Sequence, residues 1–205
     1  MPAEVIIPFE PRPLQRSVRR AMLADDRTPG ARFGVLVCHR RFGKTVLAVN
    51  LLQQSALACK KDRPRLAYIG PTYRQAKATA WDYMQHYARP IPGVTFNQQE
   101  LRVDYPTGAQ IRIYGADNPD SLRGIYLDGA VLDEYGMMQP KLFGEVIRPA
   151  MADRGGWCLF AGTPNGRNQF WEIAETAKSD PSWVYACHKA SETGILPPDE
   201  LAAAR

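Results

Sequence analysis

A glycine, a lysine and a threonine stand where an apolar segment gives way to a helical pattern: Gly43, Lys44 and Thr45. The backbone N–H groups at the start of a helix, together with the helix dipole, bind phosphate oxygens. In that setting Lys44 would reach the β- and γ-phosphates of a nucleotide, and the Thr45 hydroxyl would hold Mg²⁺. This tripeptide also arises by chance, and Cys38 occupies the position where the common phosphate-loop pattern has its first glycine, so a partner motif is needed.

An acidic pair supplies that partner motif. The segment AVLDE places Asp133 and Glu134 side by side at the end of an apolar strand. The carboxyl ends of parallel strands form the edge at which α/β proteins bind ligands. Because adjacent strand residues point to opposite sides, Asp133 can hold the metal through water while Glu134 orients an attacking water. The alternative is an ordinary solvated strand end.

Two further features are expected at the same edge of the sheet. The segment LFAGTPNG leads an apolar strand into a turn at Gly162 and Thr163, where the backbone can approach a γ-phosphate closely, although an ordinary tight turn needs no function. A guanidinium beside the charged transition state of phosphoryl transfer accelerates the reaction by roughly 10³ to 10⁵. Arg40 is the candidate for this role, and Arg41 is either solvated or paired with an acid.

The composition narrows the class of protein. A chain of 205 residues with 45% hydrophobic residues can form one substantial α/β core, and no apolar run approaches the length of a membrane span. The net charge of +5 permits a polyanionic partner without requiring one. The four cysteines form no CxxC pair and the three histidines show no metal-ligand spacing, which argues against a zinc site. The N-terminus lacks the apolar stretch of a secretory signal, and with the cysteine pattern this favours a reducing cytoplasm.

Strand and helix patterns alternate along the chain. The expected strands are 32–39, 65–72, 129–134, 157–164 and 182–191, and the expected helices are 13–23, 44–60, 73–88, 140–154 and 166–178. In the first helix, we expect one apolar side formed by Leu14, Val18, Ala21 and Met22. A period of two between residues 94 and 114, interrupted by the turn PTG, predicts an antiparallel hairpin at a sheet edge. The fold class is therefore α/β, with a mostly parallel sheet flanked by helices and an added hairpin.

The third segment of helical pattern carries basic and aromatic residues. Arg74 and Lys77 at its start could meet DNA phosphates, and a solvated helix face is an equal alternative. The aromatic residues in and before it are more typical of a core than of a platform for base stacking. They are Tyr68, Tyr73, Trp81, Tyr83 and Tyr87.

Together these motifs resemble those of the large terminase subunits of tailed bacteriophages, the ATP-driven motors that pump DNA into preformed capsids. HRRFGKT resembles their variant Walker A motif, in which an arginine several residues before the lysine is usual and the leading glycine is dispensable. NPDSLRGIYLDGAVLDEYG is similar to the approach to their Walker B motif with its catalytic glutamate, and AGTPNG to their coupling motif. The similarity spans nearly the whole chain and implies a P-loop NTPase of the ASCE, or RecA-like, type.

The resemblance implies a role for each matching residue. These roles are phosphate and Mg²⁺ binding for Lys44 and Thr45, metal binding for Asp133, water activation for Glu134, coupling for Thr163 and charge stabilisation for Arg40. Phe9, Arg12 and Gln15 are similar to an upstream segment that such motors use around adenine, with Gln15 as the best candidate. The ligands implied are ATP and Mg²⁺, and the residues expected to contact ATP are Arg12, Gln15, Arg41, Phe42, Gly43, Lys44, Thr45 and Val46. Whether Arg40 acts in its own subunit or in a neighbouring one stays open.

The resemblance also implies partners and a location. They are double-stranded DNA, the small terminase subunit and the portal protein of the procapsid, within a homo-oligomeric ring in the host cytoplasm, with a monomer in isolation and no membrane. Complete family members carry a C-terminal nuclease domain that this chain is too short to hold. We therefore expect an ATPase domain over residues 1–190, a linker or the start of a truncated region over 191–205, and no cleavage of DNA.

Two alternatives share the nucleotide chemistry. A helicase-like ATPase stimulated by nucleic acid would need single strands and unwind them, whereas a packaging motor should favour duplex DNA. An assembly protein that binds nucleotide without hydrolysis would take up Mg-ATP and release no phosphate. The side-by-side carboxylates at 133 and 134 argue against this last possibility.

Overall fold

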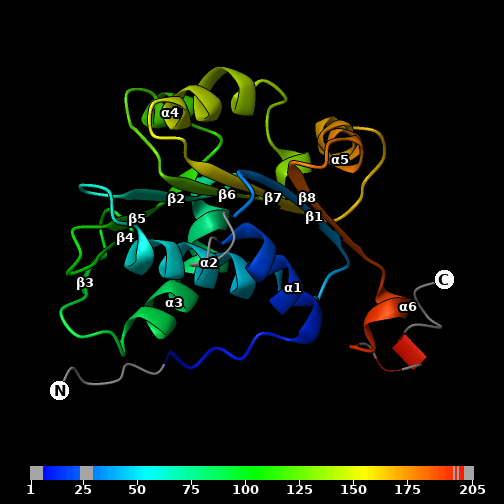
Figure 1. The fold of residues 1–205 in the computed structure, drawn as a ribbon, viewed down its shortest axis with the longest axis horizontal. Coiled ribbons are helices and arrows are strands. Elements are labelled where there is room, and N and C mark those ends of the chain that lie inside the picture. The colour runs from blue at the N-terminus through cyan, green and yellow to red at the C-terminus, as the bar shows by residue number, and fades with distance from the viewer. Residues whose placement is uncertain (1–6, 24–29, 196, 198, 201–205) are drawn as a thin grey trace.

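An eight-stranded sheet runs through the centre of the molecule, between two layers of helices (Figure 1). The computed structural model describes residues 7–23, 30–195, 197 and 199–200, so the Ala-rich ending at 201–205 lies outside the described residues. The strands are β1 (Phe33–Cys38), β2 (Arg65–Gly70), β3 (Thr95–Asn97), β4 (Arg102–Asp104), β5 (Gln110–Gly115), β6 (Gly129–Asp133), β7 (Trp157–Gly162) and β8 (Trp183–His188). Their order is β3-β4-β5-β2-β6-β7-β1-β8.

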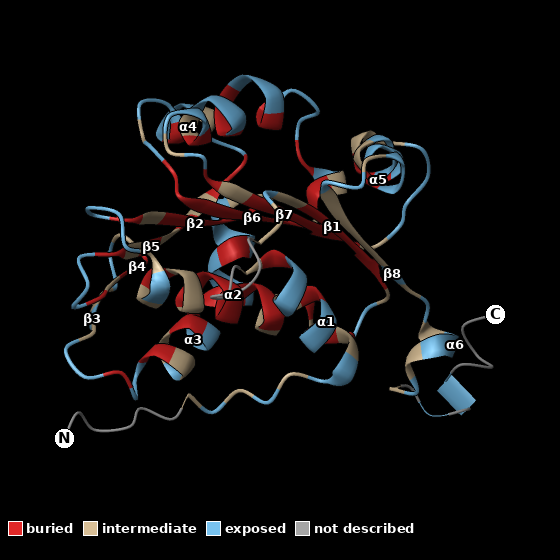
Figure 2. Ribbon diagram, in the orientation of Figure 1, coloured by how far each residue is buried: buried red, intermediate tan, exposed pale blue. Residues whose placement is uncertain are grey.

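The sheet is parallel from β5 to β8 and antiparallel only at the β3–β4–β5 end. One face is covered by α1 (Pro13–Met22), α2 (Lys44–Ala58) and α3 (Tyr73–Ala88), and the other by α4 (Arg148–Ala152) and α5 (Gln169–Ser179) (Figure 1). The central strands are buried on both sides (Figure 2), which explains why their sequences are continuously apolar rather than alternating. The expected α/β architecture is confirmed.

The expected hairpin is also confirmed. Strands β4 and β5 pair antiparallel, and the turn between them closes with hydrogen bonds between Tyr105 and both Ala109 and Gly108. Gly108 has a φ of 82°, a left-handed conformation that glycine adopts without strain. The short β3 extends the hairpin outward, while β5 joins it to the parallel sheet through β2.

The first helix is rotated relative to the sequence-based expectation. Its buried residues are Gln15, Val18 and Met22, while Ala21 is exposed and Leu14 is half-buried. Positions separated by three and four residues lie on one side of a helix, so this set forms a continuous stripe. The prediction for Ala21 was wrong because a polar residue, Gln15, takes a place on the buried side.

The helix expected over 140–154 is shorter and is wound in two ways. It begins with a π-helical turn, Phe143–Ile147, and continues as α4 to Ala152. Pro149 has no backbone N–H and cannot donate to the preceding turn, and the widened turn ends beside it with the bond from Arg148 N–H to the Phe143 carbonyl.

Short 3-10 segments, Pro119–Leu122 and Tyr135–Met137, flank β6, and a short helix, α6 (Ala190–Thr193), follows β8. No helix within the described residues is both long and apolar enough to cross a membrane.

Candidate active site

The strand order brings three separate loops to one edge of the sheet. Strand β7 pairs with β6 on one side and with β1 on the other. The loop after β1 therefore lies beside Thr163, which follows β7, and Thr163 lies beside the acidic pair at the end of β6. Because these strands are parallel, their carboxyl ends meet at the edge where α/β folds bind ligands.

Lys44 connects all three loops. Its ammonium donates a hydrogen bond of 3.1 Å to Oγ1 of Thr163, and it lies 3.5 Å from the carbonyl oxygen of Cys38. The same Nζ is 3.6 Å from Oε1 of Glu134. Lys44 is buried, and a buried cation is tolerated only when it is paired and hydrogen-bonded. The cation therefore stands at the point where the predicted phosphate, water and coupling residues converge.

Asp133 lies beside Thr45 and is almost fully enclosed. The Thr45 hydroxyl donates to Oδ2 of Asp133 at 3.3 Å, and the Glu134 N–H donates to Oδ1 at 3.1 Å. Oδ2 also accepts a hydrogen bond from the Tyr68 hydroxyl. Burial raises the pKa of the Asp133 carboxyl, and the hydrogen bond from Tyr68 opposes that rise.

These oxygens suit Mg²⁺, a hard cation that takes one or two protein oxygens and fills its other positions with water and phosphate. Thr45 and Asp133 supply a hydroxyl and a carboxylate within hydrogen-bond distance of each other. In the described part of the chain, no group of three or more His, Cys, Asp and Glu side chains is placed to cage a metal. The donor set thus fits a metal shared with a nucleotide rather than one held by protein alone.

Glu134 has an unusual backbone conformation. Its φ is 54°, in the left-handed region, where a residue with a Cβ costs on the order of 1–3 kcal/mol. This conformation ends β6 abruptly and leaves the Glu134 side chain 39% exposed beside the buried Lys44. A hollow of about 230 Å³ opens next to it, between the acidic pair and the side chains of Gln75 and Thr79. The carboxylate therefore faces space that can hold water.

The two arginines of the loop lie at its rim. Arg40 is exposed and forms no ion pair with any described residue, and the same holds for Arg41. Arg41 has a φ of 69° and Gly43 a φ of 87°, so two left-handed residues shape the loop just before α2. Val46 lies one residue beyond Thr45 and is half-buried. The roles of these residues stay predictions.

The start of α1 is anchored on the same loop. Nε2 of Gln15 donates to the carbonyl oxygens of Phe42 at 3.0 Å and Gly43 at 3.3 Å. Nη1 of Arg12 donates to the carbonyls of Phe42 at 3.1 Å and Arg41 at 3.3 Å. Gln15 is 4% exposed, and a Cβ added at Gly43 would come within 2.7 Å of its Nε2. The side chains of Arg12 and Gln15 thus attach the start of α1 to the loop before α2. Their contact with adenine stays a prediction.

Contacts with the end of β8 hold the loop from a second side. The Phe42 ring is buried and stacks on His188, with centroids 5.2 Å apart. Nε2 of His39 lies 2.9 Å from Oγ1 of Thr193 in α6. Burial lowers the pKa of His188. Sequence patterns gave no sign of these contacts, because a stack between residues so far apart depends on the pairing of β1 with β8.

Contrary to the expectation from the sequence, the aromatic residues in and before α3 are not all in the core. Tyr73 and Tyr83 are exposed on α3, so their placement in the core was wrong. The buried stripe of α3 is instead formed mainly by alanines together with Trp81 and Met84. Tyr68 is buried as expected, but its hydroxyl reaches Asp133, which the sequence did not indicate. Phe9 packs edge-on against Tyr87, with centroids 5.9 Å apart.

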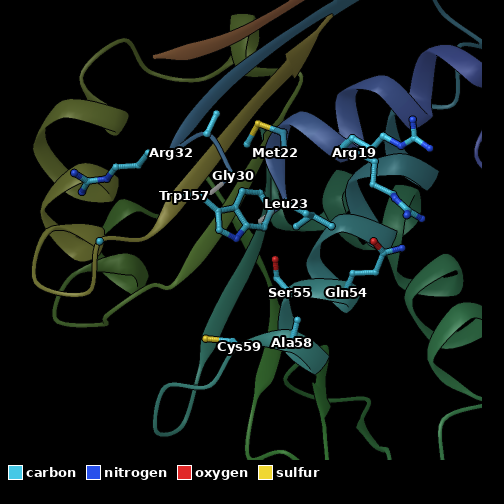
Figure 3. Close-up of a pocket in the computed structure, with 13 residues that line it drawn as sticks. Arg19, Met22, Leu23, Gly30, Arg32, Gln54, Ser55, Ala58, Cys59 and Trp157 are labelled. Atoms are coloured by element: carbon cyan, nitrogen blue, oxygen red, sulfur yellow. The ribbon is translucent and has the colours of Figure 1, made fainter. Parts of the chain in front are cut away.

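A second hollow, of about 630 Å³, lies away from this site (Figure 3). Met22, Ala58 and Cys59 line it at the carboxyl ends of α1 and α2, and Trp157 lines it at the first residue of β7. It therefore belongs to the opposite edge of the sheet from Lys44 and Asp133 and lies apart from the candidate site.

Comparison with known proteins agrees with this geometry. The family described as "Terminase large subunit, T4likevirus-type, N-terminal" matches residues 38–191, a stretch that includes Lys44, Asp133, Glu134 and Thr163. The chain belongs to the large terminase subunit family. The family resemblance and the P-loop NTPase fold class expected from the sequence are thereby confirmed.

Individual large terminases are similar over different lengths. The large subunit of Thermus phage G20c is 33% identical over 124 residues, which cover 51% of this chain and 26% of that protein, so the chain spans about a quarter of that relative. The large terminase ATPase domain of Thermus phage P74-26 has a TM-score of 0.73 at 25% identity, covering 90% of this chain and 83% of that one. The large terminase of another thermophilic bacteriophage, solved in complex with ADP, shares the fold with a TM-score of 0.75 at 14% identity, over 94% of this chain and 48% of that one.

Proposed function

We propose that this chain hydrolyses Mg-ATP and that hydrolysis powers the translocation of double-stranded DNA into a procapsid. The observation that carries the proposal is the convergence of Lys44, Thr45, Asp133, Glu134 and Thr163 at one sheet edge. The ATPase domain of the P74-26 terminase and the ADP complex of the other thermophilic phage terminase support the same assignment by similarity.

Each residue of the site has a distinct task in this proposal. Lys44 binds the β- and γ-phosphate oxygens, and Thr45 and Asp133 hold Mg²⁺, which when bound offsets charge that develops on the phosphates. Glu134 faces the hollow beside the acidic pair and orients the attacking water. Arg40, on the rim of the loop, stabilises transition-state charge in its own subunit or in a neighbour's site.

Thr163 couples the chemistry to movement. A γ-phosphate oxygen that binds Lys44 competes with Thr163 for the same ammonium donor. Loss of that phosphate returns the donor to Thr163, so the turn after β7 changes its contacts once in each cycle. The next element is α5, which is capped by the Asn168 side chain, and a shift of the turn therefore reaches a whole helix.

Membership of the family supports a set of proposed partners. We propose double-stranded DNA, the small terminase subunit and the portal protein, with the chain acting in a homo-oligomeric ring in the host cytoplasm. The net charge of +5 is compatible with a DNA partner and does not by itself specify one.

Steady-state ATPase assays test the proposal. The wild-type chain should release phosphate in the presence of Mg²⁺, and Glu134→Ala should abolish this release. Addition of duplex DNA should stimulate turnover more than single-stranded DNA does. If turnover requires single-stranded DNA and the protein separates strands, the chain is a helicase-like ATPase and not a packaging motor. If the protein binds Mg-ATP but releases no phosphate under any assembly condition, it is a nucleotide-responsive assembly protein.

A further inference from the structure

We infer that Tyr68 is a positioning residue for the metal site: its hydroxyl fixes the carboxylate of Asp133 in the orientation that holds Mg²⁺. This inference rests on the proposed function, since it assigns Asp133 to the metal. Tyr68 lies in the middle of β2, which pairs with β6, and its hydroxyl donates to Oδ2 of Asp133.

The hydroxyl, rather than the ring, is the distinctive feature of Tyr68. The ring belongs to the apolar cluster between the sheet and α2, where phenylalanine would fill nearly the same volume. The side chain is 1% exposed and lines the hollow beside the acidic pair, so a water that enters in place of the lost hydroxyl would not be held in position by the sheet. Tyr105 shows that this fold does not require a partner for every enclosed phenol, because its buried hydroxyl has none within the described residues.

The three donors around Asp133 come from different directions. The Thr45 hydroxyl approaches from the start of α2, the Glu134 N–H from the next residue of the chain, and the Tyr68 hydroxyl from the core. The Thr45 hydroxyl is itself a proposed metal ligand, so it cannot serve as an independent support for Asp133. The Glu134 N–H belongs to the loop after β6 and moves with that loop. Tyr68 is the only one of the three anchored in the middle of a sheet strand, so it is the fixed reference for the carboxylate.

Partners that orient a metal ligand typically contribute about 10- to 100-fold in metal affinity or activity. Tyr68→Phe should therefore raise the Mg²⁺ concentration at half-saturation about 10-fold when binding of a fluorescent ATP analogue is followed during a Mg²⁺ titration. Binding of the same analogue in EDTA should be unchanged, because phosphate contacts to Lys44 remain. Binding of Mn²⁺ measured by electron paramagnetic resonance, in the presence of the analogue, provides a second readout independent of turnover.

Tyr105→Phe is the matched control, since it removes an equally buried phenol oxygen far from the site and should leave the Mg²⁺ midpoint unchanged. Thermal unfolding in EDTA reports whether Tyr68→Phe folds. If Tyr68→Phe does not fold, Tyr68 can be replaced by 4-aminophenylalanine, which keeps a hydrogen-bond donor at the same ring position. This protein should retain the wild-type Mg²⁺ midpoint. The same replacement at Tyr105 is its control.

A double-mutant cycle separates positioning from general loosening of the core. In an Asp133→Asn background, Tyr68→Phe should cause no further change in Mn²⁺ binding. A wild-type Mg²⁺ midpoint in folded Tyr68→Phe, or a loss of the wild-type midpoint in the 4-aminophenylalanine protein, would overturn the inference. Absence of Mg²⁺-dependent nucleotide uptake in the wild-type chain would instead overturn the proposed function.

Discussion

Nζ of Lys44 donates a 3.1 Å hydrogen bond to Oγ1 of Thr163, a residue 119 positions later in the chain. Lys44 opens α2 directly after the loop that follows β1, and Thr163 follows β7, so the pairing of β1 with β7 creates the contact. Because the ammonium also lies 3.6 Å from Glu134, one cation joins the loop before α2, the acid proposed to orient water and the turn proposed to couple hydrolysis to movement. A phosphate bound at Lys44 must alter at least one of these contacts.

Removal of this cation should affect nucleotide binding before it affects folding. A hydrogen bond to a charged group contributes about 1.5–3 kcal/mol, which corresponds to roughly 10- to 100-fold in affinity. Lys44→Ala should weaken binding of a nonhydrolysable ATP analogue by this factor in isothermal titration calorimetry. Lys77→Ala, an exposed lysine on α3, is the control and should bind as the wild type does. Equal affinities in the two variants would remove Lys44 from the phosphate site.

Loss of the Glu134 carboxylate should reduce turnover and leave binding intact. General-base assistance contributes about 10²- to 10⁴-fold, so Glu134→Gln should lower phosphate release by that factor while calorimetry shows an unchanged affinity for the analogue. Glu145→Gln, an exposed acid in the π-helical turn, is the matched control. A Glu134→Gln protein that hydrolyses ATP at the wild-type rate would show that another group orients the water.

The backbone at Glu134 yields a separate prediction about stability. A left-handed φ costs a residue with a Cβ about 1–2 kcal/mol, and glycine escapes this cost. Glu134→Gly and Glu134→Ala both lose the carboxylate that faces Lys44, so Glu134→Gly should lose activity yet exceed Glu134→Ala in free energy of unfolding by up to about 1 kcal/mol after the greater chain entropy of glycine is counted. Urea unfolding of the wild type, Glu134→Gly and Glu134→Ala in EDTA measures the three free energies of unfolding. A Glu134→Gly protein less stable than Glu134→Ala would mean that the φ of 54° carries no strain.

Asp133 predicts a pH dependence of a defined sign. Burial raises the pKa of its carboxyl above the ordinary value of 3.8, so its favourable contribution to stability is full below that value and is lost as the pH rises through the folded-state pKa. Asp133→Asn removes this titration. In EDTA, the free energy of unfolding of Asp133→Asn relative to the wild type should therefore increase as the pH rises from 4 to 7.

Asp180 provides a control of opposite sign. Hydrogen bonds from Ser182 lower the pKa of the half-buried Asp180 carboxyl, so its contribution is present above the unfolded-state pKa and is lost as the pH falls through the folded-state pKa. Asp180→Asn should become less stable relative to the wild type as the pH rises. The same trend with pH in both variants would contradict the assignment of these two shifts.

Gln15 predicts a link between the first helix and the nucleotide loop. Its buried amide donates to the carbonyls of Phe42 and Gly43, which also accept from Arg12 and from the Leu47 N–H, so loss of Gln15 removes two hydrogen bonds that together contribute about 1–3 kcal/mol. Gln15→Ala should reduce the free energy of unfolding by this amount and weaken binding of the ATP analogue. Arg16→Ala, exposed on the same helix, should do neither. If Gln15→Ala weakens binding without any loss of stability, direct contact with the nucleotide becomes the better explanation.

Much of the site was visible in the sequence because its motifs are local. Gly43, Lys44 and Thr45 are contiguous between an apolar strand and a helix, and the acidic pair directly ends another apolar strand. Once the alternation of strands and helices indicates a parallel sheet, both motifs must lie at its carboxyl edge, because all parallel strands end on the same side. The α/β class and the edge hairpin followed from periodicity in the same way.

The remaining features depended on which strands became neighbours. The contact of Tyr68 with Asp133 needs β2 next to β6, and the bond from Lys44 to Thr163 needs β7 next to β1. The inward rotation of Gln15 depends on the loop carbonyls that it meets. Sequence alone determined which residues are candidates for the chemistry, since local spacing places them on strand ends and helix starts. Tertiary structure decided which side chains hold them in place, because hydrogen-bond partners far apart in the chain are chosen by strand order and packing rather than by local pattern.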